Sequence, residues 1–184
     1  MLGIVETHRS TPGLAGPHGQ KAAIRPVEQD DVQALKTLIA ATGLFPPDML
    51  GDMLAPYFEQ GSDGEQVWLA DDESGPLAVA YYAPERMTEG TWNLYLIAVH
   101  PEHQGRGRGS ALLRRVEATL AERGGRVLLV ETSGLPEFER TRAFYRTNGY
   151  DEEARIRDFY RAGEDKVIFW KAVVSSTLAA GRDA

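Results

Sequence analysis

Residues 104–109 read Gln-Gly-Arg-Gly-Arg-Gly, between the apolar run 94–99 (Leu-Tyr-Leu-Ile-Ala-Val) and the amphipathic stretch 110–122. The three alternate glycines let the backbone adopt positive φ and approach a ligand closely, because no Cβ is present. The free N–H groups and the dipole of a helix that begins here favour an anion. Arg106 and Arg108 add positive charge. A strand, a glycine loop and a helix in this order predict a phosphate-binding site.

Two common phosphate loops do not fit this stretch. In the dinucleotide pattern Gly-x-Gly-x-x-Gly, counting from Gly105 puts Ser110 at the last glycine, and counting from Gly107 puts Leu112 there. The Walker pattern ends in Gly-Lys-Ser/Thr, and this loop contains no lysine. The pattern that remains is Gln/Arg-x-x-Gly-x-Gly/Ala, which closely resembles the acetyl-CoA pyrophosphate loop of the GCN5-related N-acetyltransferase (GNAT) family. It is met by Gln104, Gly107 and Gly109. The plainer alternative is a glycine-rich turn without a ligand.

The composition is that of a globular enzyme. The 184 residues are 42% hydrophobic and 26% charged, which is enough for one domain with a core. The lack of cysteine excludes disulfide bonds, cysteine-ligated zinc and a cysteine nucleophile. The net charge of −7 argues against a nucleic-acid surface. No apolar run approaches the ~18 residues of a membrane span, and the N-terminus lacks the order of a signal peptide. We therefore expect a cytoplasmic protein that binds neither nucleic acid nor membrane.

Hydrophobic periodicity and turn residues divide the chain into alternating elements. Residues 1–22 carry many glycines and prolines without periodicity, which predicts a mobile tail, and 174–184 form a second tail. The domain between them, 23–173, has no internal linker. Its predicted strands are 24–27, 66–70, 76–83, 91–99, 126–130, 151–160 and 166–173, and its predicted helices are 28–42, 49–58, 110–122 and 136–148. Since the strand-helix-strand unit after residue 91 implies one parallel pair and the hairpins are antiparallel, we expect an α/β fold: a mixed sheet of about seven strands with helices on both faces.

This succession of elements is also similar to that of the GNAT family. A further resemblance lies in 141–150 (Thr-Arg-Ala-Phe-Tyr-Arg-Thr-Asn-Gly-Tyr), which is similar to the family segment Ala-x-x-Phe-Tyr-x-x-x-Gly-Phe. Tyr145 and Gly149 match, and Tyr150 replaces the usual Phe. The resemblance implies that Tyr145 approaches the CoA sulfur. One departure is Phe138, where many members place an Asn that holds pantetheine.

The resemblance also implies the cofactor contacts. In the family, the fourth strand bulges away from the fifth, and its exposed backbone pairs with the pantetheine arm of acetyl-CoA. An apolar run is also what any core strand shows, so the glycine loop decides this interpretation. The cofactor-binding residues implied are Ile97, Ala98, Val99, Gln104, Gly105, Arg106, Gly107, Arg108, Gly109, Ser110 and Phe144.

Acyl transfer to an amine needs a proton acceptor for the amine and a donor for the leaving thiolate. Tyr145 is the predicted donor, with core packing as the alternative. Some relatives use a Glu on the fourth strand as the base, but 92–99 contains no acid, so Glu131 at the end of the next strand is predicted instead. The alternative is that Glu131 pairs with a nearby Arg or with the helix that starts at Pro136. Glu85 and Glu89 are weaker options. His100 and His103 have no evident third ligand, and we expect no metal.

These features together predict an N-acetyltransferase that moves an acetyl group from acetyl-CoA to a primary amine by direct attack in a ternary complex. The alternative of another class is a non-catalytic acyl-CoA-binding or sensing module. A structural domain without a ligand is disfavoured by the glycine loop. The acceptor, a small-molecule amine or a protein or peptide amine, stays open, and so does a homodimer.

Overall fold

The computed structural model describes residues 23–61 and 64–173. The two predicted tails lie outside the described residues. No helix in the described part of the chain is long and apolar enough to cross a membrane. The seven strands are β1 (Ala23–Pro26), β2 (Val67–Asp72), β3 (Pro76–Pro84), β4 (Thr91–Val99), β5 (Val127–Ser133), β6 (Asp151–Arg161) and β7 (Glu164–Ala172). The four α-helices described are α1 (Val32–Thr42), α2 (Met49–Gln60), α3 (Arg108–Glu122) and α4 (Glu139–Thr147).

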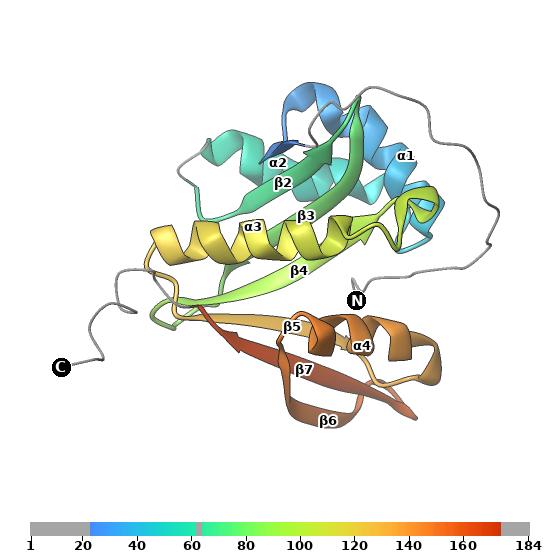
Figure 1. Cartoon of the computed structure of the whole chain (residues 1–184), viewed down its shortest axis with the longest axis vertical. Coiled ribbons are helices and arrows are strands. Elements are labelled where there is room, and N and C mark those ends of the chain that lie inside the picture. Colours follow the sequence, from blue (N-terminus) through green and yellow to red (C-terminus); the bar gives the residue numbers. More distant parts are fainter. Residues whose placement is uncertain (1–22, 62–63, 174–184) are drawn as a thin grey trace.

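The strands form one sheet in the order β1-β2-β3-β4-β5-β7-β6. Only β4 and β5 are parallel neighbours, and the remaining neighbours are antiparallel. Helices α3 and α4 cover one face, and α1 and α2 cover the other (Figure 1). The predicted mixed sheet of seven strands with helices on both faces is confirmed.

Two element boundaries differ from the prediction in ways that shape the site. Helix α3 begins at Arg108, two residues before the predicted start, because Gly107 in the left-handed conformation already turns the chain into the helix. Strand β5 continues three residues past its predicted end, because its pairing with β7 extends to Ser133. The predicted helix 28–42 is a short 3-10 turn followed by α1.

Strands β4 and β5 pair along only part of their length. The parallel register joins 91–94 to 127–130 and stops at Leu94 and Val130. At this point the pairing of β3 with β4 shifts by one residue, so that Tyr95 is the extra residue of a bulge. Figure 1 shows β4 and β5 together at one end and separated at the other. The second half of β4 therefore has a hydrogen-bonding edge that β5 does not use.

Two hydrophobic cores lie on the two faces of the sheet. The core under α3 contains the apolar stripe of that helix, whose members are buried. Alternation along β4 sends Ile97 and Val99 to this core and Leu96 and Ala98 to the core under α1 and α2. Burial of apolar surface on both faces fixes the position of β4, and with it the free edge. The stripe of α3 consists of Leu112, Leu113, Val116 and Leu120.

Arg142 on α4 fastens this helix to the end of β5. Its Nη1 donates hydrogen bonds to the carbonyl oxygens of Ser133 (2.6 Å) and Leu135 (2.8 Å), and its Nη2 pairs with Glu139 (2.7 Å). The side chain is buried. Hydrogen bonds from a charged group to carbonyls removed from solvent are among the stronger polar contacts. Arg142 thereby sets the distance between α4 and the separating strands.

We expect Arg142→Met to lower the free energy of unfolding by roughly 2–4 kcal/mol, because it leaves buried carbonyls without a donor. Urea unfolding followed by circular dichroism measures this. Arg146→Met is the matched control, since Arg146 makes exposed ion pairs on the same helix and should cost less than about 1 kcal/mol. Equal effects of the two substitutions would contradict the assigned role of Arg142.

Candidate functional site at the start of the third helix

The glycine loop has the geometry of an anion site. Gly105 and Gly107 adopt φ of 70° and 78°, in the region that side chains disfavour. The first helical hydrogen bond described runs from the N–H of Ala111 to the carbonyl of Gly107 (2.9 Å). The N–H groups of 108–110 precede this bond and have no helical acceptor. They lie at the positive end of a helix of 15 residues, where a negative charge is stabilised.

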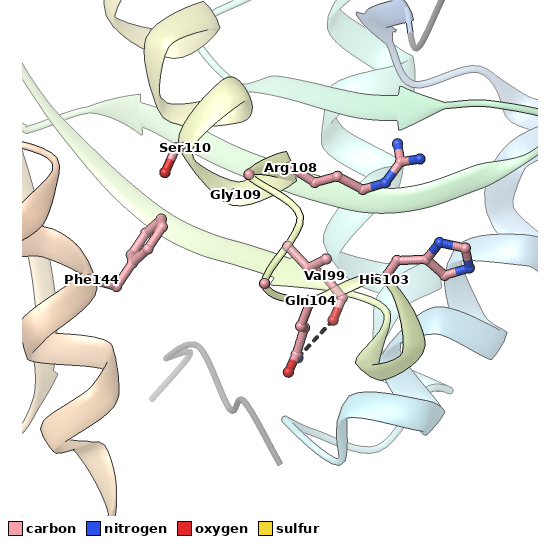
Figure 2. A pocket seen from close by; sticks show the side chains of 9 residues that line it. Val99, His103, Gln104, Arg108, Gly109, Ser110 and Phe144 are labelled. Carbon is pink, nitrogen blue, oxygen red and sulfur yellow. Dashed lines mark hydrogen bonds between the residues drawn. The ribbon is translucent and has the colours of Figure 1, made fainter. Parts of the chain in front are cut away.

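A pocket is present at this helix start, and Phe144 from α4 forms its opposite wall (Figure 2). It thus lies between the β4–α3 half of the domain and α4. No carboxylate is among the residues that line it, so nothing there repels a phosphate. The lining residues are Val99, His103, Gln104, Gly105, Gly107, Arg108, Gly109, Ser110 and Phe144.

Gly109 is required for a different reason from Gly107. Gly109 is helical, and a Cβ at this position would lie 3.1 Å from Cζ of Phe144 and 3.7 Å from Cγ2 of Val99. A Cβ on Gly107 would meet nothing within 4 Å, so only its backbone conformation demands glycine. The pattern read from the sequence therefore combines one glycine that turns the loop with one that admits the aromatic ring of α4.

Gln104 and Arg108 act on the loop itself. The Nε2 of Gln104 donates to the carbonyl of Val99 (3.0 Å), which ties the loop to the end of β4 (Figure 2). Arg108 points away from Phe144 and pairs with Asp71 (2.9 Å) and Glu73. Two carboxylates, one from β2 and one from the following turn, therefore offset the positive charge that Arg108 was expected to add to the anion site.

Arg106 keeps its charge available. Its side chain is exposed, and in 23–61 and 64–173 it forms no ion pair. It lines a neighbouring pocket between α3 and β1 rather than the pocket with Phe144. The sequence did not single out His103 as a pocket residue, yet it lines the pocket, and burial together with the charge of Arg106 lowers its pKa. His103 is thus favoured in its neutral form.

The three β4 residues predicted to bind the cofactor arm, Ile97, Ala98 and Val99, differ in the direction of their backbone N–H and C=O groups. The N–H of His100 donates to the carbonyl of Leu77 on β3, and backbone groups in a strand alternate in direction. In this register the backbone N–H and C=O of Ala98 also point toward β3. The backbone N–H and C=O of Ile97 and Val99 point the other way, toward the side of β4 that β5 leaves unpaired. Of the three, Ile97 and Val99 have groups suited to pair with a ligand.

Tyr145 lies in the core, outside the pocket that its neighbour Phe144 lines. Its side chain is 1% exposed, and its ring packs against Phe169 and Tyr150 at centroid distances of 5.4 and 5.7 Å. Burial raises the pKa of its hydroxyl well above the usual range. The hydroxyl therefore keeps its proton at neutral pH, and Tyr145 can donate a proton or hydrogen bond but cannot serve as a base.

Glu131 is the first residue of β5 beyond the pairing with β4. Its carboxylate pairs with Lys166 of β7 at 2.9 Å and is about one third exposed. Because Leu128 and Val130 face the core under α3, alternation places Glu131 on the opposite face of the sheet. Glu131 thus lies beside the separating strands, and its partner is Lys166 rather than the arginine or helix start that the sequence offered as alternatives.

The turn before the glycine loop brings together three groups. A ligand atom from each of His100, Glu102 and His103 lies within 4.8 Å of the others. The sequence analysis found no third ligand beside the two histidines, and Glu102 supplies one by geometry. All three come from a single turn at the surface, and we assign no ion to them.

Comparisons with known proteins agree with this geometry. Residues 63–152 match the family model described as the acetyltransferase (GNAT) domain. A protein of known structure from Desulfovibrio desulfuricans, assigned to the acetyltransferases of the GNAT family, is 33% identical with a TM-score of 0.78, over 84% of this chain and all of the other. The ribosomal-protein-S18-alanine N-acetyltransferase of Escherichia coli is 22% identical with a TM-score of 0.65, over 89% and 99% of the two chains. The yncA protein of Salmonella typhimurium, solved with its cofactor acetyl-CoA, is 19% identical with a TM-score of 0.68, over 84% and 95%.

The chain is thus built as an acyltransferase, with a glycine loop at the start of α3 beside a strand that has a free edge. It belongs to the GCN5-related N-acetyltransferase family.

Proposed function

We propose that this protein transfers the acetyl group of acetyl-CoA to a primary amine, by direct attack within a ternary complex. The observation that carries the proposal is the pairing of two features: the loop with free N–H groups at the start of α3, and the unpaired edge of β4 that leads away from it. One suits a pyrophosphate and the other suits an extended amide chain. The related yncA structure, which holds acetyl-CoA, supports this choice of donor.

The residues present fit such a donor. The N–H groups of 108–110 and the side chain of Arg106 would hold the pyrophosphate. The backbone of Ile97 and Val99 would pair with the pantetheine arm, and Phe144 would cover it from α4. When bound, acetyl-CoA supplies a thioester carbonyl that an amine can attack and a thiolate leaving group.

The chain's own groups handle the protons. The amine must lose its proton to attack, and the carboxylate of Glu131, where the strands separate, would accept that proton directly or through water. A backbone N–H of β4 would stabilise the oxyanion that develops on the carbonyl oxygen. As the carbon–sulfur bond breaks, the hydroxyl of Tyr145 would donate a hydrogen bond or a proton to the developing thiolate. Because burial raises its pKa, the hydrogen bond is the easier of the two contributions.

A non-catalytic acyl-CoA-binding module is the second candidate, and two observations favour it. The hydroxyl of Tyr145 belongs to a residue with almost no exposed surface, and Glu131 already pairs with Lys166. A panel of amines with acetyl-CoA separates the two candidates. Release of free thiol that depends on an amine supports the transferase, and binding of acetyl-CoA without any release supports the module.

Gly107→Val should weaken the binding of acetyl-CoA by at least about tenfold, because a branched side chain in the left-handed region distorts the loop and blocks its approach to the pyrophosphate. Isothermal titration calorimetry measures the affinity. Gly124→Val is a matched control, since Gly124 ends the same helix with φ of 74° and open space around its Cβ position. If the Gly107 variant binds as tightly as the control, the loop is not the pyrophosphate site.

Tyr145→Phe should lower kcat by about 10²–10⁴-fold with little change in acetyl-CoA affinity, because it keeps the ring and removes the proton donor. Tyr150→Phe serves as the control: its buried hydroxyl donates to Glu117 and lies in the same aromatic cluster. Steady-state rates and melting temperatures are compared. A Tyr145 variant that loses stability but retains wild-type turnover would assign the residue to packing.

Glu131→Gln should move or remove the acidic limb of the pH profile of kcat/KM, because an amide cannot accept the proton of the amine. The profile is measured over about two pH units on each side of neutrality. Glu117→Gln provides the comparison, since Glu117 forms an equivalent 2.9 Å ion pair with Lys171. An acidic limb that persists in the Glu131 variant would show that another group accepts the proton.

A further inference from the structure

The face of the sheet opposite the donor pocket carries a second group of polar and aromatic side chains. Tyr95, the bulge residue of β4, is 37% exposed. Its ring stacks on Tyr81 of β3 at 5.6 Å, and Tyr81 stacks on Trp68 of β2 at 4.5 Å. Trp68 is fully buried in the core under α1 and α2. The stacked rings of Trp68 and Tyr81 thus hold the exposed ring of Tyr95 at the point where β4 and β5 separate.

Glu85, just after β3, directs its carboxylate to this ring. One oxygen, Oε1, accepts hydrogen bonds from Nδ2 of Asn93 (2.8 Å) and from the hydroxyl of Tyr95 (3.2 Å). Within the described ranges no lysine or arginine pairs with Glu85, and its second oxygen has no hydrogen-bond partner. Asn93 is buried, and its own carbonyl oxygen also lacks a donor. Hydrogen-bond acceptors therefore outnumber hydrogen-bond donors around Glu85 and Asn93.

The pKa of the Tyr95 hydroxyl reflects the negative charge that surrounds it. Burial raises the pKa of its hydroxyl to about 12, and the negative charges of Glu85 and Glu131 act in the same direction. The charge of Glu131 is offset by Lys166, whereas that of Glu85 has no such partner. A carboxylate held by neutral donors beside an aromatic face is a favourable environment for an ammonium group, through charge and through cation–π attraction.

The position of this group relative to the donor pocket gives it a role. Phe144, Gly109 and Val99 line the donor pocket on the α3 and α4 face, while Tyr81 and Trp68 belong to the α1 and α2 face. The parallel pairing of β4 with β5 ends at Leu94, directly before Tyr95. An amine bound at Tyr95 would therefore meet, through this gap, a thioester that entered from the other side.

We infer that Glu85, supported by Asn93 and Tyr95, binds the acceptor as an ammonium ion, and that the acceptor is a primary amine with no carboxylate beside its amino group. This inference rests on the proposed function and names its substrate class. A free α-amino acid would bring its carboxylate next to Glu85 and Glu131, and repulsion would disfavour it. An amine whose neighbouring group is an amide, an alkyl chain or an aromatic ring avoids this repulsion.

The test compares phenylalaninamide with phenylalanine, two acceptors that differ only in an amide or a carboxylate beside the amine. For each, kcat/KM is measured at saturating acetyl-CoA for the wild type, Glu85→Gln and Glu89→Gln. The wild type should prefer the amide by about tenfold or more, and Glu85→Gln should reduce this ratio at least about fivefold. Because every enzyme meets the same two amines, the difference in amine pKa cancels when ratios are compared. Glu89, exposed on the same β3–β4 connection, is the matched control and should keep the wild-type ratio.

Acetyl-CoA affinity and melting temperature of Glu85→Gln should equal those of the wild type, because Glu85 lies across the sheet from the donor pocket. Equal use of the two acceptors by the wild type would overturn the inference, and so would a ratio that Glu85→Gln leaves unchanged. Transfer to other amines but not to phenylalaninamide would also overturn it. If acetyl-CoA binds but no amine of the panel releases thiol, the proposed function fails instead, and the inference fails with it.

Discussion

Strand β4 pairs with β3 along its whole length but with β5 only as far as Leu94, and this incomplete pairing governs the rest of the structure. The bulge at Tyr95 rotates the strand at the point where the parallel ladder ends. An unpaired strand edge inside a domain leaves backbone donors and acceptors without partners, which is unfavourable unless water or a ligand satisfies them. The two hydrophobic cores and the link from Arg142 to the end of β5 hold the strands in this arrangement.

The separation also divides the chemistry between the two faces of the sheet. The anion loop and Phe144 lie on the α3 and α4 face, where no carboxylate lines the pocket. Glu85, Glu131 and the ring of Tyr95 lie on the other side, where negative charge is in excess. One face favours an anionic acyl donor and the other favours a cationic amine acceptor, which suits a reaction between the two. The charge of Arg108 is offset within the fold, because Asp71 and Glu73 pair with its guanidinium group.

The sequence predicted the succession of strands and helices because that information is local. Periodicity placed the seven strands of the described sheet, and the alternate glycines placed the turn into α3. The sequence could not show that Arg108 pairs with Asp71, 37 residues away, or that Glu131 pairs with Lys166, 35 residues away. Such pairs depend on strand register, and the register of β3 with β4 depends on a bulge that no residue pattern marks. For the same reason Glu85 was only a weak candidate until its contact with Tyr95 was visible. The position of Tyr145 on α4 follows from the local pattern, but its burial depends on Phe169 and Tyr150, which lie on other elements.

The free edge of β4 is proposed to receive the pantetheine arm of acetyl-CoA, and amide hydrogen exchange can detect this contact at single residues. The register leaves the N–H groups of Ile97 and Val99 facing the gap, while that of Ala98 is bonded to β3. Exchange measured by NMR with and without acetyl-CoA should show that the amides of Ile97 and Val99 become protected when the cofactor binds. The amide of Ala98 should be protected in both states. If acetyl-CoA binds and the exchange of Ile97 and Val99 does not change, the edge of β4 is not the cofactor site.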